Sequence, residues 1–490
     1  MRVTLNTSSI DDYRTFLKVK SLPHYRFVGG DAIFPDQYAE LVTGKKAHVE
    51  AGEYIPSDFL FDYQRDIAAM AIMKRKFAVF ADCGLGKTLI FAEFAKHVLG
   101  RVSGSVLIVS PLMVVGQTIS EFERWYGDDL PIEQVRAKDL AEWAENGSGI
   151  GITNFEALGD HVDQGNISCL IVDESSMLKS HYGKWGAEIL RLGRGLDWKL
   201  CVTGTPAPND RIEYANHAVF LDAEPSINAF LARYFVNRGE KKERWVIKPH
   251  AIGPFYRSMS HWSIFLTRPA TYGWKDHADD IPPINVHIER VEMTTSQIEA
   301  IQEHTGSLIA THAGGIGSRS ILGQISKGSY KGCDIETRKP EYIRELIDSW
   351  PEEQTIIWCL YNDEQSKLAK YIPEAASITG STPLERREEI IGDFKSGRVR
   401  TLITKPKILG FGLNLQCATR QIFSGLQDSY EQYYQAVKRS NRVGSTRPLN
   451  VHIPVTDAEY PMIETVLEKA HRVQLDAEEQ EREFNAHAIK

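Results

Sequence analysis

Residues 81 to 88 read Ala81-Asp82-Cys83-Gly84-Leu85-Gly86-Lys87-Thr88, and this stretch decides the fold. It follows a short apolar run at residues 77–80 and opens a helical pattern that begins at Leu89. A strand, a glycine-containing turn and a helix in this order are the context of a phosphate-binding loop. The sequence therefore predicts an α/β domain built around this turn.

The residue types in the loop suit a nucleoside triphosphate. Glycines at 84 and 86 let consecutive backbone N–H groups point at an anion, and the helix start adds the positive end of a dipole. Lys87 would reach the β- and γ-phosphates, and the Thr88 hydroxyl would ligate Mg²⁺. We therefore expect ATP and Mg²⁺ as cofactors. Ala81 stands where the general pattern has glycine, so the alternative is a chance surface turn.

An acidic pair supplies the second half of such a site. The apolar run at residues 169–172 ends on Asp173 and Glu174. Asp173 suits Mg²⁺, and Glu174 suits the water that attacks the γ-phosphate. The alternative is an acidic strand end that caps the next helix through Asp173 or Ser175. Together with the loop, the pair favours catalysis.

Two series of apolar runs alternate with helical stretches. The first comprises residues 77–80, 106–110, 149–153, 169–172 and 200–203, and the second comprises residues 355–360, 377–379, 401–404, 421–423 and 451–454. Continuous apolar strands separated by helices indicate parallel sheets covered on both faces. Ligands of such sheets bind beyond the carboxyl ends of the strands, so the polar residues there should share one edge.

Two arginines lie more than three hundred residues beyond the loop. Arg439 and Arg442 belong to the second series of strands, which has no phosphate loop of its own. An arginine supplied across a cleft to the γ-phosphate contributes about 10³ to 10⁵ in rate, and only when the cleft is closed. The pair thus predicts two domains that share one nucleotide. A solvated helix face is the alternative for an isolated Arg-x-x-Arg.

Composition sets further bounds. The 490 residues are too many for one ordinary core, and the formal charge of −8 excludes a global basic field. The six cysteines include no C-x-x-C pair, which argues against a zinc site and against disulfides. No stretch approaches 18 apolar residues, and the start has no apolar segment of a signal peptide. We expect a cytoplasmic monomer without membrane contact.

The chain resembles superfamily-two helicase-like ATPases, specifically their Swi/Snf branch, over roughly residues 55–460. The loop is similar to the family's A-x-x-G-x-G-K-T motif, in which alanine is normal at the first position. Residues 435–444 are similar to its Q-x-x-G-R-x-x-R-x-G motif. The resemblance implies two tandem RecA-like parallel-sheet domains with a mainly helical insertion or linker between them. It also implies ATP hydrolysis coupled to movement along duplex or branched DNA.

The resemblance assigns roles to further residues. Gln64 is the candidate that reads the adenine. Coupling between ATP and DNA is implied for Thr203, Thr205, Gly412 and Gln435. Contacts to DNA are expected at strand-end loops of both domains, at Pro111, Thr153, Asn154, Ser381 and Asn414. The family's arginine role falls on Arg439 and Arg442.

Three positions depart from the family pattern. Ser176 replaces the usual last residue of the D-E-x-H box, which puts the histidine-mediated coupling in question. Lys438 replaces a glycine, and Ser445 replaces a glutamine, in the arginine motif.

These observations predict five segments: an accessory segment at 1–50, a first ATP-binding domain at 51–222, an insertion and linker at 223–335, a second domain at 336–460, and a charged helix at 461–490. Within the insertion, residues 233–245 are basic with interleaved aromatics, which suits either a DNA backbone contact or a solvated helix face. The predicted function is an ATP-dependent DNA translocase. The alternatives are a strand-separating or RNA-directed helicase and an ATP-regulated DNA clamp with little turnover.

Overall fold

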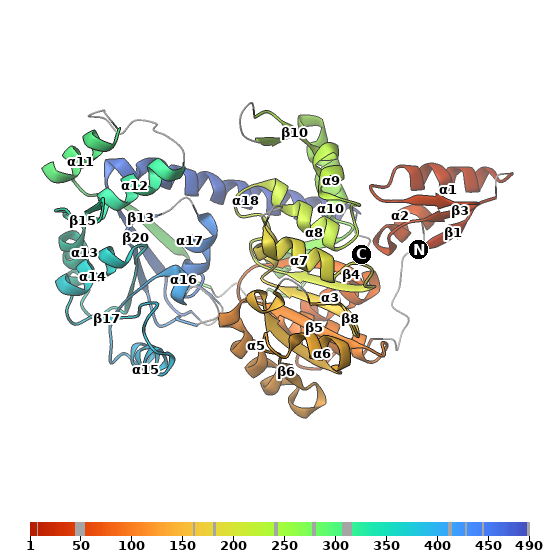
Figure 1. Ribbon diagram of the computed structural model, residues 1–490, viewed down its shortest axis with the longest axis horizontal. Coiled ribbons are helices and arrows are strands. Elements are labelled where there is room, and N and C mark those ends of the chain that lie inside the picture. Colours follow the sequence, from red (N-terminus) through yellow and green to blue (C-terminus); the bar gives the residue numbers. More distant parts are fainter. Residues whose placement is uncertain are drawn as a thin grey trace. The chain divides into compact units, whose positions relative to one another are not determined.

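The computed structural model describes residues 1–6, 8–44, 54–159, 162–179, 183–239, 244–276, 281–305, 316–409, 414–426, 429–442 and 445–487. The chain divides into two compact units. Unit 1 comprises residues 1–276 and 473–490, and unit 2 comprises residues 277–472. Both are drawn in Figure 1.

Unit 1 is built on a seven-stranded sheet with all neighbours parallel, in the order β12-β4-β9-β8-β5-β7-β6. Its strands are β4 (Lys76–Ala81), β5 (Ser105–Ser110), β6 (Ile132–Gln134), β7 (Ile150–Asn154), β8 (Ile167–Asp173), β9 (Trp198–Val202) and β12 (Ser263–Leu266). Strand β8 lies between β5 and β9, so the polar residues that end these three strands are neighbours at one edge.

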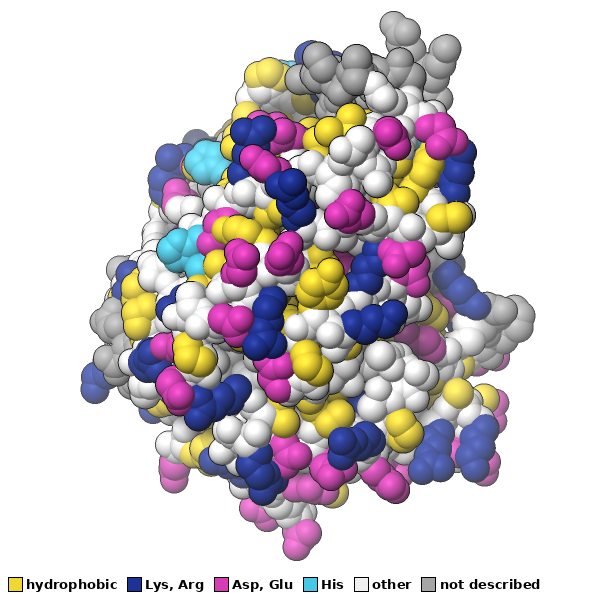
Figure 2. Space-filling view, turned by 90° about the vertical axis from the view of Figure 1, so that its left-hand side faces the viewer, with side chains coloured by type: hydrophobic (Ala, Val, Ile, Leu, Met, Phe, Trp, Pro, Cys, Tyr) yellow, Lys and Arg dark blue, Asp and Glu magenta, His cyan; other side chains and the backbone are white. Residues whose placement is uncertain are grey.

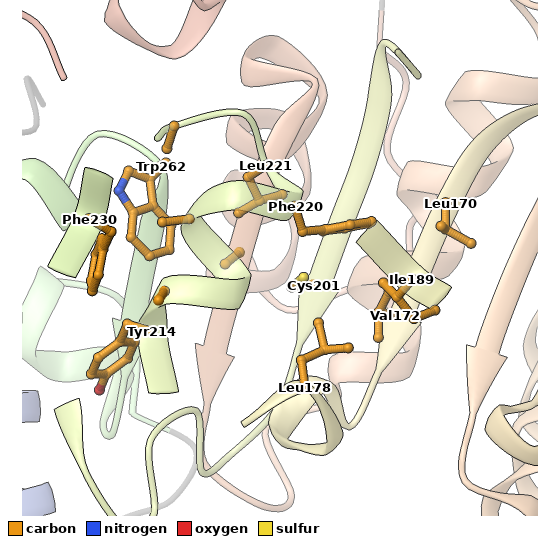
Figure 3. Packing of buried hydrophobic residues seen from close by; sticks show 14 of the residues in the cluster. Leu170, Val172, Leu178, Ile189, Cys201, Tyr214, Phe220, Leu221, Phe230 and Trp262 are labelled. Carbon is orange, nitrogen blue, oxygen red and sulfur yellow. The ribbon is translucent and has the colours of Figure 1, made fainter. Parts of the chain in front are cut away.

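The helices of unit 1 cover both faces of this sheet. They are α3 (Asp62–Lys74), α4 (Lys87–Leu99), α5 (Leu112–Trp125), α6 (Leu140–Asn146), α7 (Lys184–Leu192), α8 (Tyr214–Phe220), α9 (Ile227–Tyr234) and α10 (Ile252–Met259). Alternate residues of each central strand enter different cores: Leu170 and Val172 pack with α7 and α8, whereas Cys169 and Ile171 pack with α3, α4 and α5. Figure 3 shows the first of these cores around Leu178, Ile189 and Phe220.

The N-terminal segment forms a small layer of its own. Helix α1 (Ile10–Lys20) lies along an antiparallel sheet of order β1-β3-β2, followed by α2 (Ala39–Thr43) (Figure 1). The strands are β1 (Arg2–Thr4), β2 (Arg26–Val28) and β3 (Asp31–Ile33).

This N-terminal layer is docked on the rest of unit 1 rather than loosely attached. Side chains of the segment bind three consecutive carbonyls: Gln37 Nε2 donates to Leu221 O at 3.0 Å, Tyr38 Oη donates to Ala223 O at 3.1 Å, and His24 Nδ1 lies 2.8 Å from Asp222 O. Phe34 and Tyr38 are buried in the same core as α8. The layer is therefore part of unit 1.

Unit 2 is built on a six-stranded parallel sheet, in the order β13-β20-β19-β16-β18-β17. Its strands are β13 (Ile284–Arg290), β16 (Thr355–Trp358), β17 (Ala376–Ser377), β18 (Thr401–Thr404), β19 (Arg420–Phe423) and β20 (Leu449–Val455). Two short antiparallel pairs are also present in the described part of the chain: β10 (Phe235–Asn237) with β11 (Trp245–Ile247) in unit 1, and β14 (Ser329–Tyr330) with β15 (Cys333–Asp334) in unit 2.

The helices of the second half of the chain are α11 (Thr295–Thr305), α12 (Ile316–Ser326), α13 (Lys339–Asp348), α14 (Asn362–Tyr371), α15 (Leu384–Lys395), α16 (Pro406–Leu409), α17 (Tyr430–Val437) and α18 (Tyr460–His487). Helices α13 and α14 pack on one face of the sheet through Ile343 and Leu368, and α11 and α12 form a separate core with Met462. Helix α18 begins in unit 2 and ends in unit 1.

The predicted fold class, two tandem parallel-sheet domains of the RecA-like kind, is confirmed. Every predicted apolar run corresponds to a strand, and the segment between the domains contributes α9 to α12. In its described part, it also contributes six strands that the sequence did not predict, β10 to β15, of which β12 and β13 join the two main sheets. Strand β12 is only four residues long, and β13 is largely exposed, so neither shows a long apolar run. Residues 223–276 lie in unit 1, and residues 281–335 lie in unit 2.

No helix within the described ranges is long and apolar enough to cross a membrane. The six cysteines all lie within the described residues and form no disulfide there.

Candidate active site

The phosphate loop joins the end of β4 to the start of α4. Gly84 and Gly86 have φ of +89° and +67°, a conformation that side chains rarely adopt. A Cβ at Gly86 would also collide with the Gln64 amide. The backbone conformation at position 86 therefore favours glycine, and a larger residue there would also displace the Gln64 amide.

Lys87 is held at the base of the loop. Its Nζ donates to Ala81 O at 3.0 Å and to Asp82 O at 3.3 Å. Burial opposes the charged form of Lys87, but the nearby Cys83, Glu174, Asp82 and Asp173 outweigh it and raise its pKa. The ammonium group thus stays charged and lies close enough to the acidic pair to interact with it.

Gln64, the candidate for reading the adenine, lies beside the loop. It is buried in α3, where its Oε1 accepts from Phe61 N at 3.0 Å and its Nε2 approaches Leu85 O at 3.5 Å. Tyr63 Oη also donates to Leu85 O, at 3.2 Å. The glutamine thus links the start of α3 to the phosphate loop.

Asp173 ends β8 and is braced from the neighbouring strand. Ser110 Oγ, at the end of β5, donates to Asp173 Oδ2 at 2.8 Å, and the backbone N–H of Glu174 donates to Oδ1 at 3.0 Å. Burial and the charge of Glu174 raise the pKa of Asp173 to about 7, although Ser110 and Lys87 oppose the shift. The role of Ser110 was not predicted from the sequence; the only signal was a hydroxyl residue at a strand end.

Glu174 is braced from the other side. Its backbone lies in the left-handed region, with φ of +47°, which is uncommon for a residue with a side chain. Thr203 Oγ1, just beyond β9, donates to Glu174 Oε2 at 3.0 Å and accepts from Thr205 N at 3.2 Å. Hydroxyls from the two strands that flank β8 therefore orient the two carboxylates.

This donor set fits a divalent cation bound together with phosphate oxygens. Mg²⁺ is usually held by one or two carboxylates and by substrate phosphates rather than by a cage of protein ligands. The described residues contain no cluster of three or more His, Cys, Asp or Glu that would form such a cage. The raised pKa of Asp173 shows that its negative charge is poorly compensated, which a cation would correct.

Ser176, which replaces the family's histidine, is buried. A histidine reaches the same box from α8 instead: His217 Nε2 lies 3.0 Å from Ser175 Oγ. Burial lowers the pKa of His217 to about 4, so this imidazole is neutral at physiological pH. The direct bond from Thr203 to Glu174 links the box to the following motif without a histidine.

The three residues of unit 1 proposed to contact DNA differ in their surroundings. Pro111 immediately precedes α5. Thr153 is buried, 1% exposed, and its hydroxyl donates to Val135 O at 2.8 Å, so it does not present this group to solvent. Asn154 is half-buried and donates to Glu156 Oε2 at 2.7 Å.

Arg439 and Arg442 follow α17 in unit 2. Arg439 is nearly buried, 9% exposed, and its carbonyl accepts from Leu415 N at 2.9 Å. Arg442 Nη1 donates to Asn414 Oδ1, so a residue proposed to contact DNA bonds directly to a proposed catalytic arginine. Ser445 closes the turn: its Oγ accepts from Arg442 N at 3.2 Å and donates to Ser440 O at 2.7 Å.

The other proposed residues of unit 2 are separate from this turn or outside the described part. Gln435 is buried in α17, and Ser381 is exposed next to Thr379, with the two hydroxyls 3.0 Å apart. Lys438 places its Nζ 5.6 Å from the ring centre of Tyr434. Gly412 lies outside the described residues.

The basic stretch at 233–245 is partly described. Arg233 donates to Pro23 O at 3.0 Å and pairs with Glu224 at 3.2 Å, so it helps to hold the N-terminal layer. Residues 240–243 lie outside the described part. On the face drawn in Figure 2, Lys and Arg side chains are interspersed with Asp and Glu, and neither sign dominates.

The loop, its lysine and the braced carboxylates together define a nucleotide site of the phosphate-loop class. The model of the SNF2-related domain matches residues 73–330, and that of the helicase conserved C-terminal domain matches residues 338–444. Since the first match spans more than half of the chain, this protein belongs to the SNF2-related family.

Similar proteins include the ATP-dependent DNA helicase DDM1 of Arabidopsis thaliana, 24% identical over 75% of this chain and 55% of that protein. The DNA annealing helicase and endonuclease ZRANB3 of Bos taurus is 21% identical over 80% of this chain and 38% of that protein. The chain thus spans about half the length of the Arabidopsis protein and a smaller share of the Bos taurus protein. Among solved structures, the SWI2/SNF2 ATPase core of Sulfolobus solfataricus in complex with dsDNA is 18% identical, covers 88% of this chain and 96% of that one, and has a TM-score of 0.40.

Proposed function

We propose that this chain is an ATP-driven DNA translocase. Lys87 and the loop hold the triphosphate, Thr88 and Asp173 hold Mg²⁺, and Glu174 activates the attacking water. The observation that carries the proposal is the pair of carboxylates at the end of β8, each oriented by a hydroxyl and both near the lysine of the loop. Positioned acid–base and metal groups are what phosphoryl transfer to water requires.

The second domain has the complementary role in this proposal. Arg439 and Arg442 stabilise the charge on the transferring phosphoryl group when the two domains close on ATP. Opening after hydrolysis then moves the contacts of one domain along the nucleic acid.

The same proposal includes the domain bounds, which are 51–222, 223–335 and 336–460, with flanking segments at 1–50 and 461–490. It also includes that the protein acts as a cytoplasmic monomer.

DNA is the proposed track because relatives over most of this chain carry the names of DNA helicases. We expect contacts mainly to phosphates, from Pro111, Asn154, Ser381 and Asn414 at the strand ends. Such binding weakens steeply as salt is raised and depends little on base sequence.

The variant Glu174→Gln tests the catalytic assignment. It keeps the shape of the side chain but removes the general base, so ATP binding should persist while hydrolysis falls by about 10²-fold or more. The measurement is steady-state ATP hydrolysis with and without duplex DNA, together with binding of a fluorescent ATP analogue. Glu188→Gln on α7, where Glu188 pairs with Arg191, is the matched control and should behave as wild type.

Turnover at the wild-type rate in Glu174→Gln would remove this residue from the mechanism. Wild-type protein that binds DNA but hydrolyses ATP slowly, with no stimulation by DNA, would instead support an ATP-regulated clamp. Stimulation by RNA rather than DNA would support an RNA-directed helicase. Unwinding of a forked duplex, compared with displacement of a triplex strand, separates a strand-separating helicase from a pure translocase.

A further inference from the structure

The N-terminal layer carries an aromatic pocket that the ATP site does not use. The cavity measures about 400 Å³. It lies between the start of α1 and the β2–β3 hairpin and is lined by Leu5, Asn6, Asp12, Tyr13, Phe16, Phe27, Gly29 and Gly30. Its volume suits one flat ring system with its substituents.

The walls of the pocket are aromatic rings that remain open to solvent. Tyr13 and Phe16 have ring centres 6.2 Å apart and planes at 21°, and Phe16 and Phe27 have centres 5.0 Å apart and planes at 34°. Tyr13 is 55% exposed, and Phe27 is 37% exposed. A group of exposed aromatic rings around a cavity indicates a binding site more often than it indicates an ordinary solvated surface.

Charged groups of both signs lie near the aromatic rings of the pocket. Asp12 contributes a carboxylate whose Oδ2 accepts from Asn6 N at 2.7 Å. A cation borders the rings: Lys20 Nζ lies 5.4 Å from the ring centre of Phe16. The pocket thus combines stacking surfaces, a hydrogen-bond acceptor and positive charge.

We propose that this pocket binds an unpaired nucleobase of a DNA strand. The inference rests on the proposed function, because the DNA on which the motor moves supplies the base. The rings stack on its faces, Asp12 accepts from an exocyclic amine, and Lys20 approaches an adjoining phosphate. The preferred substrate is then a duplex with a single-stranded end or gap rather than an uninterrupted duplex.

An aromatic or aliphatic side chain of a protein partner fits this chemistry less well. It would cover the rings and desolvate the Asp12 carboxylate while adding no donor beyond the backbone N–H of Asn6, which is unfavourable. A base with an amino group adds a donor to the carboxylate and meets Lys20 through its phosphate. The charges at the rim therefore favour a nucleotide.

The test compares two DNA molecules and four proteins by fluorescence anisotropy, using the full chain without nucleotide. One DNA is a blunt duplex, and the other is the same duplex with a short single-stranded dC overhang. Wild type should bind the overhang DNA about tenfold more tightly, since stacking of one base has an effect of this order. The double variant Tyr13→Ala with Phe27→Ala should lose this preference and keep its affinity for the blunt duplex.

Leu17→Ala is the matched control, because Leu17 is 49% exposed on the same helix but does not line the cavity. It should keep the preference, and so should Phe27→Tyr, which retains a ring. A preference that survives in the double variant overturns the proposal. Equal affinities of wild type for the two DNA molecules also overturn it and leave the pocket to a protein partner.

The same proteins separate this inference from the proposed motor function. Stimulation of ATP hydrolysis by blunt duplex should be equal in wild type and in the double variant. If blunt duplex stimulates neither protein while the overhang preference depends on the rings, the motor function fails and the pocket stands.

Discussion

Two hydroxyl side chains position the acidic pair of the candidate active site. Ser110 and Thr203 bond to Asp173 and Glu174 from opposite neighbours of β8. The carboxylates themselves could be predicted, because they directly follow an apolar strand. Their partners could not, because the sequence does not show that β5 and β9 flank β8. Only the order of strands in the sheet brings residues 110, 173 and 203 together.

Ser110→Ala should weaken the apparent affinity of the active site for Mg²⁺. Without the hydroxyl, Asp173 loses one of its two orienting donors, and such changes around a metal ligand typically cost about 10- to 100-fold in metal affinity or activity. We expect the Mg²⁺ concentration for half-maximal hydrolysis to rise about tenfold, with little change in the maximal rate. The measurement is ATP hydrolysis across a Mg²⁺ titration at saturating DNA.

Ser105→Ala is the control for this prediction. Ser105 begins the same strand and is equally buried, and its hydroxyl has no hydrogen-bond partner among the described residues. This variant should titrate with Mg²⁺ as wild type does. Identical curves for both serine variants would show that Ser110 does not orient the metal ligand.

At the scale of elements, the hardest feature to predict from the sequence is a charged residue whose side chain forms buried hydrogen bonds. The sequence suggests a charged helix without a site at residues 476–483. In the structure, Tyr256 Oη and Arg211 Nη2 each donate to Asp476 Oδ1 at 2.6 Å, and Thr267 Oγ1 donates to Glu481 Oε1 at 2.6 Å. These partners lie more than two hundred residues away in the sequence, so no local pattern indicates them.

A buried charge triad joins three elements of unit 2. Glu459, in the 3-10 helix η8 (Asp457–Glu459), pairs with Lys327 after α12 and with Lys339 of α13, each at 2.5 Å. All three side chains are buried. Glu459→Gln leaves two buried cations without their anion, which should destabilise unit 2 by about 3–5 kcal/mol. Hydrogen–deuterium exchange of β19 and β20 should accelerate accordingly.

Asp457→Asn, on the same short helix, is the matched control. Asp457 pairs with Arg290 at an exposed position, so its exchange pattern should match that of wild type. Exchange in Glu459→Gln that is no faster than in the control would show that the triad does not hold these elements together.

The same triad predicts a dependence on pH. Burial opposes ionisation of Glu459, but Lys327 and Lys339 outweigh it and lower its pKa to about 2. A depressed pKa in the folded state means that the contribution is complete above the unfolded value of about 4.5 and is lost as the pH falls through about 2. The free energy of unfolding of unit 2 should therefore fall with pH in this range in wild type, and it should fall less in Glu459→Gln.

At the scale of the whole molecule, the net charge opposes the DNA binding that we propose. A formal charge of −8 repels DNA at long range, so binding must come from local loops at the strand ends. The two sheets could be predicted because parallel strands buried on both faces appear as apolar runs. The docking of residues 1–44 on unit 1 could not, because it depends on Gln37 and Tyr38 reaching carbonyls more than 180 residues away.

Coupling between the two domains is tested by Arg442→Ala. Stimulation by DNA should fall by about 10³-fold, because the guanidinium that stabilises the negative charge on the transferring phosphoryl group is lost, while the affinity for ATP in unit 1 is retained. Asn414→Ala removes one hydrogen-bond partner of the guanidinium and not its charge, so it should reduce stimulation less. Lys438→Ala, which removes a neighbouring cation stacked on Tyr434, should leave stimulation intact. The measurement is ATP hydrolysis at increasing duplex concentration, with nucleotide binding measured in parallel. Stimulation that survives in Arg442→Ala would place this arginine outside the catalytic step, and equal losses in Arg442→Ala and Lys438→Ala would indicate a general loss of cationic surface.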